Sequence, residues 1–203
     1  MRHIFEQGRD PKAPTLVLFH GTGGTEHDLL PLAGIISPES SVLGLRGNVL
    51  ENGMQRFFRR LSEGVFDEDD LIARTKEVGD FLDQAAGQYD FDRENAVAVG
   101  YSNGANIACS LLFHYPKVLR GAILHHPMVP RRGIELPDMT AMPIFIGAGS
   151  NDPICSTKET EELGQLLREA GASVSVHWEH YGHQLTPSEA QAASVWFREQ
   201  GWL

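Results

Sequence analysis

The fold follows from residues 96–110, which read AVAVGYSNGANIACS. The unbroken apolar run at 96–99 predicts a strand buried on both faces, and the small residues from 105 onward predict a helix. Between them, GYSNG at 100–104 matches the pattern G-x-S-x-G. In this pattern a strained turn from strand to helix raises a serine hydroxyl above a sheet, and flanking glycines leave room for neighbouring chain. The stretch therefore predicts a nucleophilic serine, Ser102.

Strands and helices alternate along the rest of the chain. Apolar runs predict the strands of a mostly parallel sheet at residues 14–19, 42–45, 96–100, 121–124, 144–147 and 174–176, with an edge strand at 2–6. Capping residues predict helices from Asp67 to about Ala86, ended by Gly87, from Ser156 to Ala170, and after Thr186. In the last helix, Glu189 has the spacing of the reciprocal glutamate of a capping box. This alternation predicts an α/β fold with helices on both faces of the sheet.

The length and the charge of the chain limit the functions that it can have. With 203 residues and no linker or repeat, the sequence predicts one domain over 1–203. Lysine and arginine total 17 against 27 acidic residues, a formal charge of −10, so neither nucleic acid nor an anionic membrane is an expected partner. Two cysteines outside any C-x-x-C pair predict no disulfide scaffold and no cysteine zinc site. The lack of a leader-like or membrane-spanning apolar run predicts a cytoplasmic protein.

A serine hydroxyl is a weak nucleophile that needs a base, and the base needs an acid to orient it. In folds with this elbow the acid and then the histidine follow the serine, each after a later strand. Asp152 lies in a turn just after the strand predicted at 144–147, and His183 lies in the loop before the last helix. The sequence therefore predicts a triad of Ser102, Asp152 and His183.

An oxyanion hole requires two backbone N–H donors, one of them from the residue after the nucleophile. That residue is Asn103. The glycine-rich stretch HGTGG at 20–24 follows an early strand and predicts Thr22 as the second donor. A phosphate-binding loop is the alternative for this stretch, but it lacks the Lys-Ser/Thr of a P-loop and the spacing of a dinucleotide fingerprint.

Residues 46–66 interrupt the alternation of strands and helices. They form either a surface excursion whose aromatic side chains seal the sheet edge or a cover for substrate, and Met54, Arg56 and Phe57 are the candidate substrate contacts. The arginines at 46, 56, 59 and 60 either bind an anionic substrate or are solvated in an exposed segment, and we favour the second reading.

Several histidines allow more than one interpretation of their role. His125 and His126 end a strand at the edge where the triad is expected, so His126 either lines the pocket or, as the favoured reading has it, makes structural hydrogen bonds. His177, His180 and His183 are three residues apart, and residues so spaced point to opposite faces of an extended segment. We therefore expect no metal site there.

On these motifs the chain resembles the carboxylesterase/phospholipase family of small α/β-hydrolases, which includes the acyl-protein thioesterases. The resemblance rests on residues 20–24, residues 100–104, Asp152 in its turn, and Gly182-His183. The segments 46–47, 52–54, 56–58 and 63–66 are similar to a bacterial subgroup linked to hydroquinone and aromatic-compound stress. The resemblance implies an α/β-hydrolase fold without a lid domain, a Ser102–Asp152–His183 triad, and no cofactor. Homodimers occur in the family, which leaves a homodimer open.

The chain also departs from its thioesterase relatives, which usually carry leucine at the place of Thr22, aspartate at Gly24 and glutamine at Asn103. Long-chain acyl and protein substrates are therefore less expected. The resulting prediction is a serine carboxylesterase that hydrolyses small, short-chain esters through an acyl-enzyme. The alternatives are a thioesterase or lysophospholipase with the same triad, and a catalytically silent relative that only binds ligands.

Overall fold

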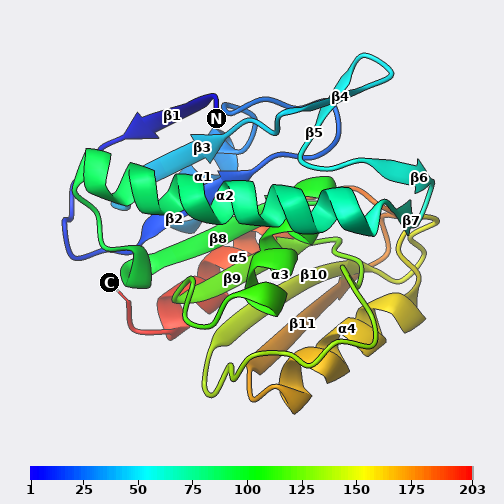
Figure 1. Cartoon of the computed structure of the whole chain (residues 1–203). Helices are drawn as coiled ribbons and strands as arrows, with labels where there is room; N and C mark the ends of the chain where they lie inside the picture. Colours follow the sequence, from blue (N-terminus) through cyan, green and yellow to red (C-terminus); the bar gives the residue numbers. More distant parts are fainter. Residues whose placement is uncertain (203) are drawn as a thin grey trace.

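A twisted sheet of seven strands forms the centre of the computed structural model, which describes residues 1–202 (Figure 1). The strands are β1 (His3–Glu6), β3 (Val42–Leu45), β2 (Thr15–Phe19), β8 (Ala96–Tyr101), β9 (Gly121–His125), β10 (Pro143–Gly149) and β11 (Ser173–Glu179), in that spatial order. β1 pairs with β3 antiparallel, and the other neighbouring pairs are parallel. The predicted mostly parallel sheet and its edge strand at the N-terminus are thus confirmed.

Helices cover both faces of the sheet, as expected (Figure 1). One face carries α2 (Glu68–Tyr89), α3 (Asn103–His114) and α4 (Thr157–Glu169), and the other carries α1 (Leu30–Ile36) and α5 (Pro187–Glu199). Each helix layer and the sheet face beneath it enclose one cluster of buried apolar side chains. A short 3-10 turn, Arg93–Asn95, leads into β8. Within residues 1–202 no separate lid domain covers the carboxyl ends of the strands.

The predicted helix starts are confirmed, because the side chains of Asp67, Ser156 and Thr186 accept backbone N–H bonds at the starts of α2, α4 and α5. The predicted end of α2 is wrong. The helix continues through Gly87 to Tyr89, whose ring stacks on Phe5 at 4.3 Å between centroids. This tertiary contact extends the helix beyond the residue that local propensity favoured as a stop.

Three further elements differ from the expectation. α1 had no counterpart in the predicted elements, although Pro31 in its first turn is a helix-start signal. β11 is an edge strand with alternating exposure along Ser173–Glu179, so it is not covered on both faces. Glu189 lies in the first turn of α5, and its backbone N–H donates to Thr186 as in a capping box. Its carboxylate contacts His125 and His126 and not the start of its own helix, so the predicted reciprocal role of the glutamate is wrong.

Residues 46–66 fold into two small hairpins near the carboxyl ends of the strands (Figure 1). β4 (Val49–Glu51) pairs with β5 (Met54–Arg56), and β6 (Arg60–Ser62) pairs with β7 (Val65–Phe66). Between the hairpins, Phe57 and Phe58 are buried in the core. The central aromatic residues of this segment thus seal the core, as the first alternative has it, and the second hairpin borders the cavity described below. No helix within residues 1–202 has both the length and the apolar character needed to cross a membrane.

Candidate active site

Ser102 occupies a strained position between β8 and α3. Its φ of 53° and ψ of −116° lie outside the regions that a residue with a side chain prefers. The backbone N–H of Ser102 donates to His125 O at 2.9 Å, which ties the turn to the neighbouring strand β9. Gly104 allows the close approach behind the turn, because a Cβ at this position would lie 2.0 Å from Phe19 O. The geometry is that of the predicted elbow.

The structure brings Ser102, His183 and Asp152 into one hydrogen-bonded chain. His183 Nε2 lies 2.8 Å from Ser102 Oγ, and His183 Nδ1 lies 2.6 Å from Asp152 Oδ2. The other carboxylate oxygen accepts N–H bonds from Ile154 at 2.8 Å and Cys155 at 3.0 Å. Burial alone raises the pKa of Asp152, but these N–H bonds and His183 outweigh it, and the pKa falls below its usual value. An ionised Asp152 places the His183 proton on Nδ1 and leaves Nε2 to accept the serine proton.

The two predicted oxyanion donors line the same cavity as Ser102 and His183. Thr22 follows β2, and Asn103 begins α3, where the helix dipole favours negative charge. Within residues 1–202, no acceptor forms a hydrogen bond with the backbone N–H of either residue. Both N–H groups are therefore available to a ligand.

The strand β5 and the residue after it hold both of these positions in place. Arg56 Nη1 donates to Thr22 Oγ1 at 2.6 Å, and Gly23 N donates to Gln55 O at 2.7 Å. Phe57 N donates to Asn103 Oδ1 at 2.7 Å. Residues 55–57 thus connect the glycine-rich loop to the start of α3. This function of the segment has no sequence signature, because it consists mainly of backbone contacts.

Replacement of Arg56 by methionine should lower kcat by about 10- to 100-fold, which is less than the loss of a whole oxyanion donor causes. The apolar stem remains, but Thr22 loses its anchor, while Glu51 keeps its ion pair with Arg60. The matched control is Arg59→Met, since Arg59 is 61% exposed and pairs with Asp67 and Asp70 outside the site. Steady-state kinetics on one ester compare the two variants. Equal kcat values in the wild type and Arg56→Met would rule out the anchoring role.

A cavity of about 250 Å³ opens beside Ser102. Polar and apolar groups together line this cavity: Thr22, Arg56, Arg60, Glu63, Gly64, Phe66, Tyr101, Ser102, Asn103, Asn106, His126, Met128, Ile154 and His183. Of the predicted substrate contacts, Arg56 and His126 belong to this lining, whereas Met54 and Phe57 do not. Phe57 is 1% exposed and packs on Phe19 and His20, and Met54 is 39% exposed at a hairpin end.

Several lining residues were missed from the sequence. Phe66 and Glu63 come from the second hairpin, and Met128 and Ile154 follow β9 and β10. A usable signal for the last two was their position just after strands that end at the same sheet edge as Ser102.

The favoured interpretation of solvated arginines holds for the 61% exposed Arg59, but it is wrong for Arg46, Arg56 and Arg60. Each pairs with a carboxylate: Arg46 with Glu26, Arg56 and Arg60 with Glu51, and Arg59 with Asp67 and Asp70. Arg56 is only 4% exposed. These ion pairs fasten the hairpins to the rest of the chain.

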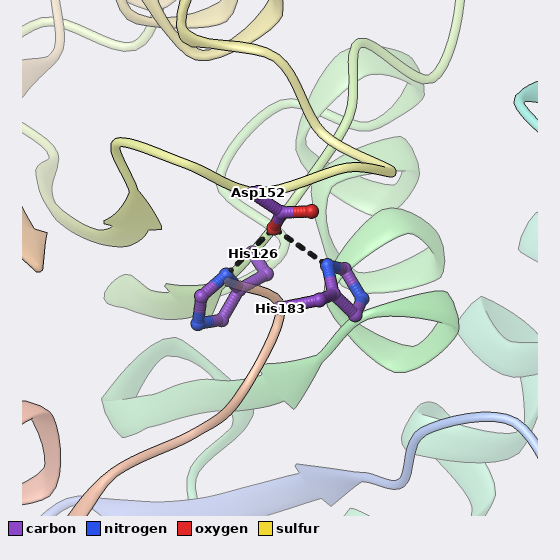
Figure 2. A group of neighbouring side chains, drawn as sticks. All are labelled: His126, Asp152 and His183. Carbon is purple, nitrogen blue, oxygen red and sulfur yellow. Dashed lines mark hydrogen bonds and ion pairs between the residues drawn. The ribbon is translucent and has the colours of Figure 1, made fainter. Parts of the chain in front are cut away.

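His126, Asp152 and His183 place three atoms of metal-ligand type within 4.8 Å of one another (Figure 2). Both Nδ1 atoms face the same oxygen, Asp152 Oδ2, at 3.0 Å and 2.6 Å. Those distances are hydrogen bonds, so protons occupy the space between these atoms. The group fits a hydrogen-bonded relay, and we assign no metal to it. His177 and His180 bond Glu179 and Ser150 and do not join His183.

A mostly parallel sheet covered by helices, with a strained serine after one strand and an acid and a histidine after later strands, defines the α/β-hydrolase class. Within that class the chain belongs to the dienelactone hydrolase family, whose model matches residues 64–196. The chain is 61% identical over 199 residues to the putative hydrolase MhqD of Bacillus subtilis (strain 168), and the match covers 98% of each chain.

Solved structures agree with this assignment. A Bacillus cereus carboxylesterase superposes with a TM-score of 0.97 and 62% identity, covering 98% of this chain and 94% of the other. YahD, solved with malic acid, superposes with a TM-score of 0.93 and 30% identity, covering 98% of both chains. The matches confirm the resemblance to small bacterial α/β-hydrolases that the motifs indicated. They support a hydrolase of the esterase type.

Proposed function

We propose that this protein is a serine carboxylesterase that hydrolyses small, short-chain carboxylic esters through an acyl-enzyme. The observation that carries the proposal is the continuous hydrogen-bonded chain from Ser102 through His183 to Asp152, which reaches an open cavity at its serine end. A relative that only binds ligands would have no need of this alignment. Similarity to a hydrolase and to a carboxylesterase supports the same reaction class.

The mechanism follows from the positions of the atoms. Ser102 Oγ attacks the ester carbonyl carbon while His183 Nε2 takes the hydroxyl proton, and Asp152 stabilises the resulting imidazolium. The carbonyl oxygen becomes an oxyanion that accepts from the N–H groups of Thr22 and Asn103. When the intermediate collapses, His183 returns the proton to the departing alcohol and Ser102 keeps the acyl group. A water molecule activated by His183 then attacks this ester, releasing the acid and restoring the serine.

The size of the cavity supports the preference for short chains. Sites for drug-sized ligands have volumes of roughly 300–1,000 Å³, and this cavity holds about 250 Å³. Its apolar wall is formed by Phe66, Met128 and Ile154, which suits a short acyl or alcohol group. A long acyl chain would leave the cavity and lie on the surface, so the lysophospholipase alternative gains no support.

The proposal is tested with a series of 4-nitrophenyl esters from acetate to laurate. We expect kcat/KM to be highest for acetate to butyrate and to fall by at least about tenfold at octanoate, because one extra methylene in a matched pocket is worth 1–3 kcal/mol. The corresponding thioesters of acetate and butyrate distinguish a carboxylesterase from the thioesterase alternative. Highest activity on laurate or on the thioesters would reject the short-chain carboxylesterase, and no turnover of any ester would reject the enzyme.

A further inference from the structure

His126 lies behind the triad and is not required by the serine mechanism itself. It follows β9 with a φ of 54°, a left-handed conformation that is uncommon for a residue with a side chain. Its ring is 1% exposed and contacts the same Asp152 oxygen as His183 does (Figure 2). The sequence left open whether His126 lines the pocket or bonds structurally, and here it does both.

The neighbours of the His126 ring determine its charge. Nδ1 lies 3.0 Å from Asp152 Oδ2, and Nε2 lies 3.1 Å from both Gln184 O and Glu189 Oε2. These partners are carboxylate and carbonyl oxygens, which can only accept. A neutral imidazole has one bare nitrogen, and here that nitrogen would face an acceptor with no proton between them. Both nitrogens must therefore carry protons, which makes the ring an imidazolium.

Glu189 supplies the negative charge that such a cation needs. Its side chain is fully buried in the first turn of α5, and its two oxygens contact His125 Nδ1 and His126 Nε2. Burial raises the pKa of Glu189, but the hydrogen bonds from His125 and His126 outweigh it and hold the pKa below its usual value. Gly147 in β10 makes the room, because a Cβ there would lie 1.9 Å from Glu189 Oε1. The elements α5, β9 and β10 thus meet at this carboxylate.

His125 differs from His126 in its partners although it contacts the same glutamate. Its Nδ1 donates to Glu189, but its Nε2 is buried without a partner among residues 1–202. Both ring nitrogens of His126, in contrast, face oxygen acceptors. The charge at Glu189 is therefore balanced by His126.

We propose that His126 is a permanently protonated positioning residue that bridges Asp152 and Glu189, fixes the Asp152 carboxylate, and sets the pH at which His183 becomes charged. Its effect on turnover rests on the function proposed above. The His126 and His183 rings are 5.0 Å apart between centroids, close enough for one charge to oppose the other. A cationic His126 thus keeps His183 in its neutral, proton-accepting form down to lower pH.

The titratable groups around His126 all affect the electrostatic interaction between His126 and His183. Asp152 approaches from the turn after β10, Glu189 from α5, His183 from the loop before α5, and Tyr101 from the end of β8. Tyr101 remains a neutral phenol, since burial raises its pKa, and its hydroxyl donates to His183 O at 2.6 Å. Asp152, Glu189 and His126 together carry one positive and two negative charges before His183 is protonated.

The test uses the whole protein labelled with 15N-histidine and begins without substrate. In two-bond proton–nitrogen spectra, both nitrogens of His126 should show the protonated form from pH 5.5 to 8. His126→Asn removes the charge but retains an N–H near Asp152 and tolerates the left-handed backbone. In this variant the midpoint of the His183 titration should move up by at least about one pH unit, because a unit charge about 5 Å away is lost.

Further variants separate charge from packing. Glu189→Gln should move the His183 midpoint down, and His126→Asn/Glu189→Gln should return it towards the wild-type value, because one charge of each sign is then removed. His125→Asn is the matched control, a buried neighbour on the same carboxylate, and should leave the midpoint within about 0.3 pH units.

The acid limb of kcat/KM on the best ester should follow the same order among these variants. A bare nitrogen on His126 at pH 7, or an unmoved midpoint in His126→Asn, would overturn the proposal. Because the titrations need no substrate, a protein that hydrolyses no ester would refute the function while the spectra still decide the charge of His126.

Discussion

Ser102→Ala should lower kcat for ester hydrolysis by at least about three orders of magnitude. Removal of a nucleophilic serine from a complete triad costs about 10⁶ in a well-studied protease, and the remaining oxyanion donors and binding contacts account for the residual rate. Here the loss should fall on kcat, because Thr22 and Asn103 still bind the carbonyl oxygen. The rate is measured under single-turnover conditions with a 4-nitrophenyl ester, and mass spectrometry of quenched wild-type samples should locate the acyl group on Ser102.

Two controls accompany this variant. Ser102→Ala keeps the strained backbone and removes only the hydroxyl, so its free energy of unfolding should stay within about 1 kcal/mol of the wild type, the net contribution of one hydrogen bond. Ser102→Gly should be equally inactive but more stable by about 1 kcal/mol, because glycine adopts a φ of 53° without strain. If Ser102→Ala keeps most of its activity, another residue is the nucleophile and the elbow is only a turn.

Most of the sheet and the elbow could be predicted from sequence because they depend on local signals. The apolar run before Ser102, the glycines around it and the caps at Asp67, Ser156 and Thr186 each fix a structure within a few residues. The order of acid and histidine after the serine then follows from the connectivity of parallel strands. These parts needed no knowledge of distant contacts.

The parts that could not be predicted depend on contacts between distant segments. Glu189 has the local spacing of a capping box, yet its carboxylate contacts His125 and His126, which lie more than sixty residues earlier in the chain. Residues 55–57 show no catalytic motif, because they hold the oxyanion loop mainly through backbone groups. The sequence favoured a solvated Arg56 because its contacts with Thr22 and Glu51 exist only in the folded state and leave no local pattern.

Gly104→Ala should destabilise the protein by about 3 kcal/mol or more and lower kcat/KM by about 10²- to 10³-fold. The added Cβ would lie 2.0 Å from Phe19 O and 2.5 Å from His20 O, which are backbone atoms at the end of β2 and cannot move alone. Overpacking of this kind costs 1–3 kcal/mol and sometimes more. Since the same backbone leads into the loop that carries Thr22, the strain displaces one oxyanion donor, whose loss costs 10²–10³ in rate.

The matched control is Gly87→Ala, the same substitution in the exposed interior of α2. Apart from the backbone of the helix itself, no heavy atom of residues 1–202 lies within 4 Å of a Cβ there, so alanine should stabilise the helix by about 0.5–1 kcal/mol and leave kcat/KM unchanged. Urea unfolding gives the two stabilities, and kinetics on a butyrate ester give the activities. If Gly104→Ala matched Gly87→Ala in both, close contact between the elbow and the end of β2 would not be needed. If Gly104→Ala lost stability but kept full activity, the packing of α3 would not determine the position of Thr22.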